Sequence, residues 1–423
     1  MLDIKFIRKN KELVKKCITA KNEKADIDKF LKIDKKLKEL KFQFEEKRKL
    51  QNSVSKQIAE YKKNRKNADK EIEEMKKIAG EIKDINAEIN KISEEFHRIY
   101  LTIPNIFDDS VPIGKSDEDN VVIKEWGKKQ LSNFEPLNHI ELSEKLQLID
   151  FKRAVKIAGS GFVCYTDRGA NLERALINFM LDFHQKNHGY QEIFPPFLAN
   201  RKTMTGTGQL PKLEEDMYIV EQDDFFLIPT AEVPVTNFHQ DEILDEDELP
   251  IKYVAYTPCF RREAGSYGKE TKGLQRIHQF NKVELVQFVK PENSENALHE
   301  ILRSAEAVLQ ALKLPYRVRL LCSGDLSFAA YKCYDIEVWA GGVGKYLEVS
   351  SCSNYIDFQA RRANIRYRSK KDGKVHFVHT LNGSGVATPR TMIAILENYQ
   401  NSSGEIIVPE PLRKYLGNIE IIK

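Results

Sequence analysis

The sequence predicts an α+β protein, with a long antiparallel helical hairpin (a coiled-coil arm) followed by a larger domain of strands and helices. Three observations support this fold class. Apolar residues recur at alternating spacings of three and four through residues 30–99. Residues 256–289 contain two strand-like segments joined by a glycine-containing loop, and the G-x-G-x-x-G fingerprint of a parallel dinucleotide-binding sheet is absent.

Length and composition limit the number of domains. A chain of 423 residues is too long for one ordinary hydrophobic core, so we expect at least two domains. Pro, Gly and Asp residues gather between positions 103 and 120 and mark a linker. We therefore expect an N-terminal domain over residues 1–108 and a second domain over residues 109–423.

The cysteines and the N-terminus indicate a cytoplasmic protein. Six cysteines are scattered without a C-x-x-C pair, which argues for a reducing compartment and against a disulfide framework or a thiolate zinc site. The charged N-terminal segment has no signal-peptide core, and no apolar run reaches membrane-spanning length. We predict no membrane association.

The hairpin rests on two apolar seams. The first has only two polar members and comprises Phe30, Ile33, Leu37, Leu40, Phe44, Lys47, Gln51, Val54, Ile58 and Tyr61. The second has none and comprises Met75, Ile78, Ile82, Ile85, Ile89, Ile92, Phe96 and Ile99. Because only a short polar run separates them, we expect two antiparallel helices about 50 Å long.

Charge is distributed unequally over this hairpin. Residues 28–66 hold fourteen Lys or Arg against six Asp or Glu, whereas residues 67–100 hold six against nine. The turn carries four cations, which favour contact with an RNA backbone: Lys62, Lys63, Arg65 and Lys66. The alternative is a solvated coiled coil that only spaces two domains, since charged outer faces are normal.

Residues 137–196 predict two helices and two strands. We expect an amphipathic helix over residues 137–150, a strand over residues 161–169, a longer apolar-striped helix that Gly189 stops, and a strand running into Pro195. The stripe comprises Leu172, Leu176, Phe179, Met180 and Phe183. His184 and His188 have the spacing of helical metal ligands, but no acidic partner accompanies them, so we predict no metal there.

The segment 256–289 combines a polar strand face with a basic loop. Alternation places one set on a single face of the first strand: Cys259, Arg261 and Glu263. On the second strand one face carries Phe280, Lys282, Glu284 and Phe288, and the other carries Val283, Leu285 and Val289, which can pack. The loop contains Gly265, Gly268, Lys269, Lys272, Gly273 and Arg276, a composition that suits an anionic ligand.

Three further segments hold candidate site residues. Thr230 and Glu232 follow a short strand and could hold an ammonium group, although such a pair is more often a solvated edge. Glu348 and Ser351 lie three residues apart, so both can face one ion only if their strand is bulged. Thr388 is a plausible N-cap ahead of Pro389, and Arg390 then lies in the first helical turn, where an anion is favoured. Before that helix, residues 383–385 predict a close-approach loop.

These segments resemble, in order and spacing, the three signature motifs of class II aminoacyl-tRNA synthetases, in the form found in bacterial-type seryl-tRNA synthetases. Residues 170–198 resemble the first motif, residues 256–289 the second, and Arg390 matches the arginine of the third. The class I signatures HIGH and KMSKS are absent. The resemblance covers nearly the whole chain and implies an antiparallel catalytic sheet flanked by helices, in a homodimer.

The resemblance also implies a reaction. The enzyme would activate L-serine with ATP to seryl-adenylate and transfer the seryl group to the 3′ end of serine tRNA, with selenocysteine tRNA as a further candidate. The helical arm would grip the long variable arm of the tRNA through Lys62, Lys63, Arg65 and Lys66. Neither step needs a protein nucleophile, so catalysis should come from positioning and charge.

Site residues follow from the motifs position by position. Arg261 and Arg390 would be catalytic. ATP would contact Arg261, Arg262, Glu263, Arg276, Phe280, Glu348, Val349, Ser350, Ser351 and Arg390. Serine would contact Thr230, Ala231, Glu232, Arg261, Glu284 and Ser384. Mg²⁺ would be held by Glu348 and Ser351, because hard oxygen ligands suit that ion. Arg262 departs from the usual small polar residue of the motif, and alternation points it away from the site.

Two other functional classes are weighed against this one. An adenylate-forming relative that loads a carrier protein would keep the pocket and lack the arm, yet this chain has the arm. An inactive coiled-coil scaffold would keep the arm and lose site residues, yet every motif residue is present.

Overall fold

The structure is a computed structural model and describes residues 1–129, 133–263 and 272–423. These residues form two compact units: one contains Asp3–Thr19 and Glu23–Pro104, and the other contains Met1–Leu2, Ala20–Asn22 and Asn105–Lys423. The division after Pro104 lies close to residue 108, where the linker composition placed it. Among the described helices none is both long and apolar enough to cross a membrane. Gly265, Gly268 and Lys269 of the basic loop lie outside the described residues.

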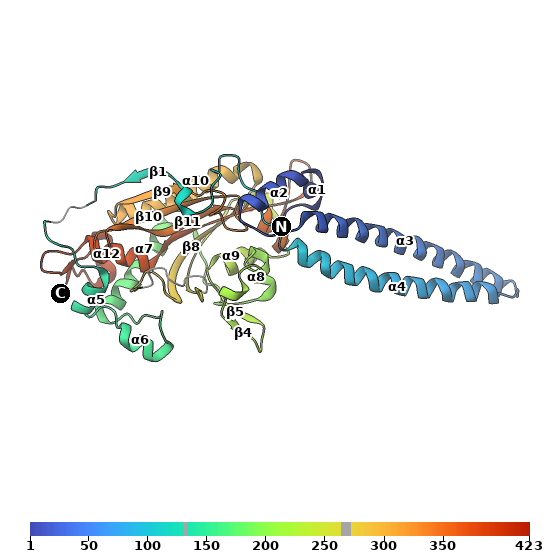
Figure 1. Cartoon of the computed structure of the whole chain (residues 1–423), viewed down its shortest axis with the longest axis horizontal. Helices are drawn as coiled ribbons and strands as arrows, with labels where there is room; N and C mark the ends of the chain where they lie inside the picture. Colours follow the sequence, from blue (N-terminus) through green and yellow to red (C-terminus); the bar gives the residue numbers. More distant parts are fainter. Residues whose placement is uncertain (130–132, 264–271) are drawn as a thin grey trace. The chain divides into compact units, whose positions relative to one another are not determined.

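The smaller unit is helical. Its elements are α1 (Ile4–Lys9), α2 (Lys11–Ala20), α3 (Ile27–Lys63) and α4 (Asp69–Tyr100). The last two lie side by side as an antiparallel pair (Figure 1), which confirms the predicted hairpin. The side chain of Asp26 accepts the N–H of Lys29 and caps α3. At the end of the hairpin opposite the turn, the Phe30 ring stacks on Phe96, with ring centroids 4.9 Å apart.

The larger unit is built on one main sheet. In the described residues it has eight strands, in the order β1 (Val121–Trp126), β9 (Tyr316–Leu320), β10 (Lys332–Ala340), β11 (Lys345–Asn354), β14 (His379–Ala387), β8 (Gln279–Val289), β7 (Ile251–Phe260) and β2 (Gln191–Glu192). Every pairing is antiparallel except that of the edge strand β2 with β7. The predicted α+β class is confirmed.

Helices cover one face of this sheet. They are α5 (His139–Lys145), α7 (Asp167–His188), α10 (Ser294–Ala311), α12 (Thr388–Asn398) and α13 (Glu410–Arg413), with α6 (Phe151–Ala158) beside them (Figure 1). Val283, Leu285 and Val289 of β8 join the core beneath the helices, whereas Phe288 packs in a second core on the opposite face. The alternation predicted for β8 is therefore confirmed, and the polar face is left for a pocket.

The remaining elements form small sheets and short helices. The sheets are β3 (Leu198–Asn200), β5 (Phe225–Leu227) and β4 (Ile219–Val220); β13 (Val375–Phe377), β12 (Arg366–Arg368) and β6 (Ile243–Asp245); and β15 (Ile406–Ile407) with β16 (Ile421–Ile422). The helices are α8 (Arg201–Thr207), α9 (Glu232–Thr236) and α11 (Phe358–Ala363).

Two sequence predictions ahead of α7 are wrong. The helix expected over residues 137–150 stops at Lys145, because Gln147 adopts a φ of 54°, and α6 then starts afresh at Phe151. The strand expected over residues 161–169 is reduced, in the described chain, to one isolated bridge between Ile149 and Tyr165. Its length is cut short because α7 already begins at Asp167.

Two predictions near α12 are also wrong. Ala387, rather than Thr388, is the N-cap, and the Thr388 hydroxyl instead donates to the buried carboxylate of Glu173. Residues 383–385 belong to strand β14 and do not form a loop. The register between β14 and β8 shifts after Ser384, so an irregularity in a strand supplies the close approach that the glycines suggested.

Candidate active site

The polar face of the main sheet opens into two adjoining cavities. One has a volume of about 560 Å³ and the other about 280 Å³. They share a charged lining: Arg261, Glu263, Arg276, Lys282, Glu348, Ser351 and Ser384. Thr230, Glu232 and Glu284 line only the larger cavity, and Phe280 and Arg390 only the smaller one. Residues predicted from separate motifs are thus brought to one place.

Glu284 lies at the bottom of the larger cavity, on β8. Its carboxylate is 2.7 Å from the ammonium of Lys282, and the two side chains are only 1% and 9% exposed. Asn382 of β14 donates to the other carboxylate oxygen at 2.9 Å, and the Thr230 hydroxyl lies 3.4 Å away. A carboxylate held in this way can accept a hydrogen bond from a small hydroxyl group.

Glu232 begins helix α9 and points toward the same cavity. It is 6% exposed, and burial raises its pKa to about 7, with the Glu284 carboxylate adding to the rise. Gln359 donates to one carboxylate oxygen of Glu232 at 2.6 Å, and the backbone N–H of Glu232 donates to the Thr230 hydroxyl. Two carboxylates close together favour a cation, so this corner can hold an ammonium group.

Arg261 stands where the two cavities meet. Its guanidinium lies 5.2 Å from the centre of the Phe280 ring, and its Nε donates to the carbonyl of Pro229. Arg276 donates to the Glu263 carboxylate at 2.9 Å, and both of these side chains line the cavities. A cation, an aromatic ring and a carboxylate are therefore available to one planar, anionic ligand.

Arg390 closes the smaller cavity from the first turn of α12. Its guanidinium donates to the Glu348 carbonyl at 2.8 Å and to the Gln275 carbonyl at 3.3 Å. The Glu348 carboxylate is 3.5 Å away. A cation at a helix N-terminus, beside free backbone N–H groups, favours phosphate.

A bulge in β11 brings Glu348 and Ser351 to the same face. Ile336 pairs with Ser350 and Glu337 with Glu348, which leaves Val349 as the extra residue. Both side chains line the cavities, so the bulge that their spacing required is present. Asp335 lies opposite Ser351 in register, and burial, followed by the Glu348 carboxylate, raises its pKa well above the usual value.

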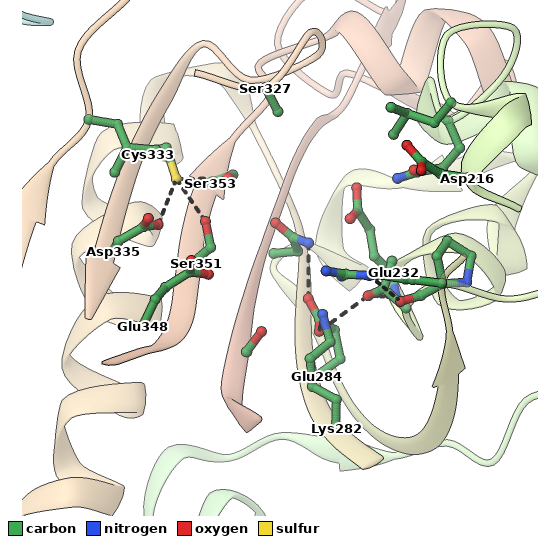
Figure 2. A pocket seen from close by; sticks show the side chains of 18 of the residues that line it. Asp216, Glu232, Lys282, Glu284, Ser327, Cys333, Asp335, Glu348, Ser351 and Ser353 are labelled. Atoms are coloured by element: carbon green, nitrogen blue, oxygen red, sulfur yellow. Dashed lines mark hydrogen bonds and ion pairs between the residues drawn. The ribbon is translucent and has the colours of Figure 1, made fainter. Parts of the chain in front are cut away.

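The β10 and β11 residues face the β8 and α9 residues across the larger cavity. Figure 2 shows Cys333, Asp335, Glu348, Ser351 and Ser353 on one side, and Asp216, Glu232, Lys282 and Glu284 on the other. The cavity thus separates a metal-compatible acidic wall from a carboxylate pair suited to an ammonium group.

Some predicted residues line neither cavity, and others line only one. Ala231 is fully buried in the second core, and Val349 and Ser350 line only the smaller cavity. The Arg262 guanidinium lies 5.9 Å from the centre of the Tyr218 ring, and among the described residues Arg262 contributes to neither cavity. His184 and His188 bond to each other at 3.0 Å, and His184 also meets the Gly385 carbonyl.

Sequence reasoning assigned no site role to several lining residues, among them Asn382, Lys282 and Asp335. Asn382 could have been found, because it lies two residues before Ser384 and so shares its strand face. Lys282 was placed on the correct face, but its ion pair with Glu284 was not foreseen. Asp335 carried no signal, because its position depends on the register between two strands.

The turn of the hairpin presents the four predicted cations to solvent. Lys62, Lys63, Arg65 and Lys66 are all exposed. Other lysines of α3 are engaged across the hairpin: Lys29 with Glu95, Lys36 with Glu88 and Lys47 with Glu81. Within the described chain no ion pair is formed by the four turn residues, so their charge is available to a polyanion.

Family comparisons divide the chain as the fold does. Residues 1–107 match the seryl-tRNA synthetase N-terminal domain, and residues 216–399 match the tRNA synthetase class II core domain (G, H, P, S and T). The serine–tRNA ligase of Thermodesulfovibrio yellowstonii is 54% identical over 426 residues, and that of Thermoanaerobacter pseudethanolicus 56% identical over 423. Both alignments cover 100% of each chain.

Solved structures agree. The seryl-tRNA synthetase of Pyrococcus horikoshii, complexed with ATP, superposes with a TM-score of 0.92 at 38% identity over 100% of this chain and 99% of its own. The cytoplasmic serine–tRNA ligase of Naegleria fowleri, in complex with AMP, superposes with a TM-score of 0.87 at 29% identity and the same coverage.

Proposed function

The chain belongs to the seryl-tRNA synthetase family, and from this premise we propose that it performs a two-step ligation of serine to tRNA. In the first step a serine carboxylate oxygen attacks the α-phosphorus of ATP, forming seryl-adenylate and releasing pyrophosphate. In the second, a hydroxyl at the 3′ end of serine tRNA attacks the seryl carbonyl and AMP leaves. The observation that carries the proposal is the arrangement of Arg261 between a cavity with paired carboxylates and a cavity with Arg390.

The serine subsite is the floor of the larger cavity. Glu232 and the Thr230 hydroxyl take the ammonium group, and Glu284 with Ser384 takes the side-chain hydroxyl. Lys282 and Asn382 hold the Glu284 carboxylate in one orientation, so its accepting lone pairs point at a fixed place. Because Glu284 is 1% exposed, a substrate without a hydroxyl would leave a buried carboxylate incompletely bonded.

The ATP subsite is the smaller cavity. Phe280 supplies a ring for the adenine, and Glu263 accepts from the adenine amino group. Arg261 meets the α-phosphate and the serine carboxylate, while Arg276 and Arg390 meet the outer phosphates. The cations are fixed before the reaction by Pro229, Glu263 and Gln275, so little reorganisation is needed as charge develops. Val349 and Ser350 line the same cavity, whereas we assign no ATP contact to Arg262.

Glu348 and Ser351 fit a magnesium ion. The bulge at Val349 turns both oxygens toward the cavities, and Mg²⁺ in nucleotide sites is usually held by one or two carboxylates together with phosphates. When bound there, the ion would neutralise phosphate charge. Across the described residues no set of three His, Cys, Asp or Glu side chains forms a protein-only metal site.

The helical hairpin is the proposed contact for the long variable arm of serine tRNA, through Lys62, Lys63, Arg65 and Lys66. These cations are exposed and, within the part of the chain that the structure describes, form no ion pair, whereas Lys36 and Lys47 of α3 are paired; this difference supports the assignment. We also propose a homodimer formed through α7 and the strand after it. Strand β2 ends the sheet, and Phe194, which follows it, is 70% exposed.

The proposal is tested by serine-dependent exchange between pyrophosphate and ATP, measured with and without tRNA, and by charging of serine tRNA and selenocysteine tRNA. We expect exchange without tRNA and charging of serine tRNA. Exchange with no charging would point instead to an adenylate-forming enzyme that loads another carrier. Absence of both would overturn the proposal.

A further inference from the structure

The two ends of helix α12 hold Leu274 and Gln275, which are consecutive residues at the edge of the smaller cavity. At the N-terminal end, Arg390 donates to the carbonyl of Gln275. At the C-terminal end, Glu397 is linked through His139 to the N–H of Leu274. Leu274, Gln275 and Arg276 all line the cavity, so any shift of this short segment moves the proposed phosphate-binding cation Arg276.

The link through His139 is buried and specific. The His139 and Glu397 side chains are 1% and 0% exposed, with 2.9 Å between Nδ1 and Oε1. The Leu274 N–H reaches His139 Nε2 at 3.2 Å. Because an N–H can only donate, Nε2 must be unprotonated, and Nδ1 must therefore carry the proton that it donates to Glu397.

Glu397 fixes this ring orientation through four donors. One carboxylate oxygen accepts from His139 Nδ1 and from the His139 backbone N–H, and the other accepts from the N–H groups of Gly342 and Val343, each at 2.9 Å. Both oxygens are satisfied without solvent. The ring thus has one tautomer and one position.

The approach of the segment to His139 leaves no space for a side chain. At Gly273, which has a φ of 67°, an added Cβ would lie 2.1 Å from His139 Nε2. The glycine therefore serves both the left-handed turn and the contact with the ring.

We propose that His139, oriented by Glu397, is a positioning residue for ATP: it fixes residues 274–276 so that Arg276 and the cavity wall meet the nucleotide. This role rests on the proposed function, and nothing in it requires His139 to touch substrate. Its loss should weaken nucleotide binding more than serine binding.

Two substitutions of His139 separate positioning from packing. In His139→Asn the amide can still donate to Glu397 but ends short of Leu274, leaving a buried N–H without an acceptor. In His139→Gln the amide oxygen can reach the Leu274 N–H. The matched control is Tyr316→Phe on β9. It removes a hydroxyl that donates to the buried Glu306 of α10, and Tyr316 lines neither cavity.

The readouts are KM for ATP and for serine in pyrophosphate exchange, ATP affinity by calorimetry in the absence of serine, and the unfolding midpoint. We expect His139→Asn to raise KM for ATP and to weaken ATP binding about tenfold, with KM for serine changed less than about twofold. His139→Gln should stay within about threefold of wild type for ATP. All three variants, including Tyr316→Phe, should lower the unfolding midpoint.

Three results would overturn the inference. They are a His139→Asn variant whose KM for ATP rises no more than that of Tyr316→Phe, equal losses for ATP and serine, and a tenfold loss for ATP in His139→Gln. The last result decides the question even if His139→Asn does not fold. Wild-type exchange is measured alongside: its absence would mean that the proposed function has failed, whereas active wild type with unaffected variants would mean that only this inference has failed.

Discussion

Two ion pairs with nearly the same length lie in very different surroundings. Lys36 and Glu88 join the helices of the arm at 2.6 Å, with side chains 51% and 45% exposed. Lys282 and Glu284 meet at 2.7 Å in the pocket, with side chains 9% and 1% exposed. Water reaches both partners readily on the arm and has little access to either partner in the pocket. Distance therefore says little about the importance of a charge, and exposure says much.

The difference extends to whole regions. On the arm, charged residues recur along exposed faces. A single residue there can therefore be replaced with little effect, and the total charge of the face decides how strongly it attracts a polyanion. In the pocket each charge has particular partners: Glu284 has Lys282 and Asn382, and Arg276 has Glu263. Substitutions in the pocket should therefore cause larger losses of activity and stability than substitutions on the arm. In the pocket, a second substitution that removes the partner should recover part of the lost stability.

The largest effect is expected for Glu284→Ala. It should lower discrimination of serine against alanine by up to about 10⁴-fold, because a site built to bond a hydroxyl penalises the analogue that lacks it. It should also destabilise the protein by about 3–5 kcal/mol, because Lys282 is left buried without its partner. Exchange kinetics with serine and alanine, together with thermal unfolding, measure both effects.

The double variant Lys282→Met, Glu284→Ala should recover much of the lost stability while discrimination stays low. Glu88→Ala on the arm is the matched control and should leave the unfolding midpoint nearly unchanged. If Glu88→Ala and Glu284→Ala destabilised the protein equally, the contrast between the two ion pairs would be wrong.

Arg390→Ala should reduce the rate of pyrophosphate exchange by about 10²–10³-fold, because one preorganised charge is removed from the transition state. Arg262→Ala is the control: it removes an equal charge from the second motif, but that side chain lies over Tyr218 outside both cavities. We expect less than about a threefold change there. If the two variants lost comparable exchange activity, we would infer that Arg262 does contact ATP.

The arm could be predicted almost completely from sequence, whereas the pocket could be predicted only in part. Helical periodicity is local, so the seam from Phe30 to Tyr61 fixed the pairing of α3 with α4. Strand alternation likewise assigned the two faces of β8. The family resemblance supplied the roles that we propose for Arg261, Glu284 and Arg390, which no spacing could have given.

The errors share a physical cause. Asp335 lies opposite Ser351 only because β10 and β11 pair in one register, and this register cannot be predicted from the sequence of either strand alone. Thr388 resembled an N-cap locally, yet its hydroxyl serves Glu173, more than two hundred residues earlier in the chain. The same limit hid the bond between His139 and Leu274.

The four cations at the turn of the arm should act as a group. Replacing Lys62, Lys63, Arg65 and Lys66 by glutamine should raise KM for serine tRNA about tenfold or more and flatten its salt dependence, because fewer counterions are released on binding. KM for ATP should not change. Charging assays at several salt concentrations measure this.

Replacing Lys36 and Lys47 by glutamine controls for charge on the same helix, since both lysines are already paired across the hairpin. That variant should shift KM for tRNA less per charge removed. Equal effects per charge would mean that the arm attracts RNA through its net charge alone and that the turn has no special role.

The smallest effect concerns pH. Burial and the Glu284 carboxylate raise the pKa of Glu232 to about 7, so in the empty pocket this group is largely protonated at pH 6 and largely ionised at pH 8. An ammonium group binds the ionised form, so KM for serine should fall as pH rises through 7. The ionised fraction of such a group grows from about a tenth to about nine tenths over that range, which sets the change at about tenfold. KM for ATP, measured in the same exchange assay, should change less. Glu232→Gln should raise KM for serine at pH 8 and abolish its pH dependence, and a slope that survived this substitution would assign the titration to another group.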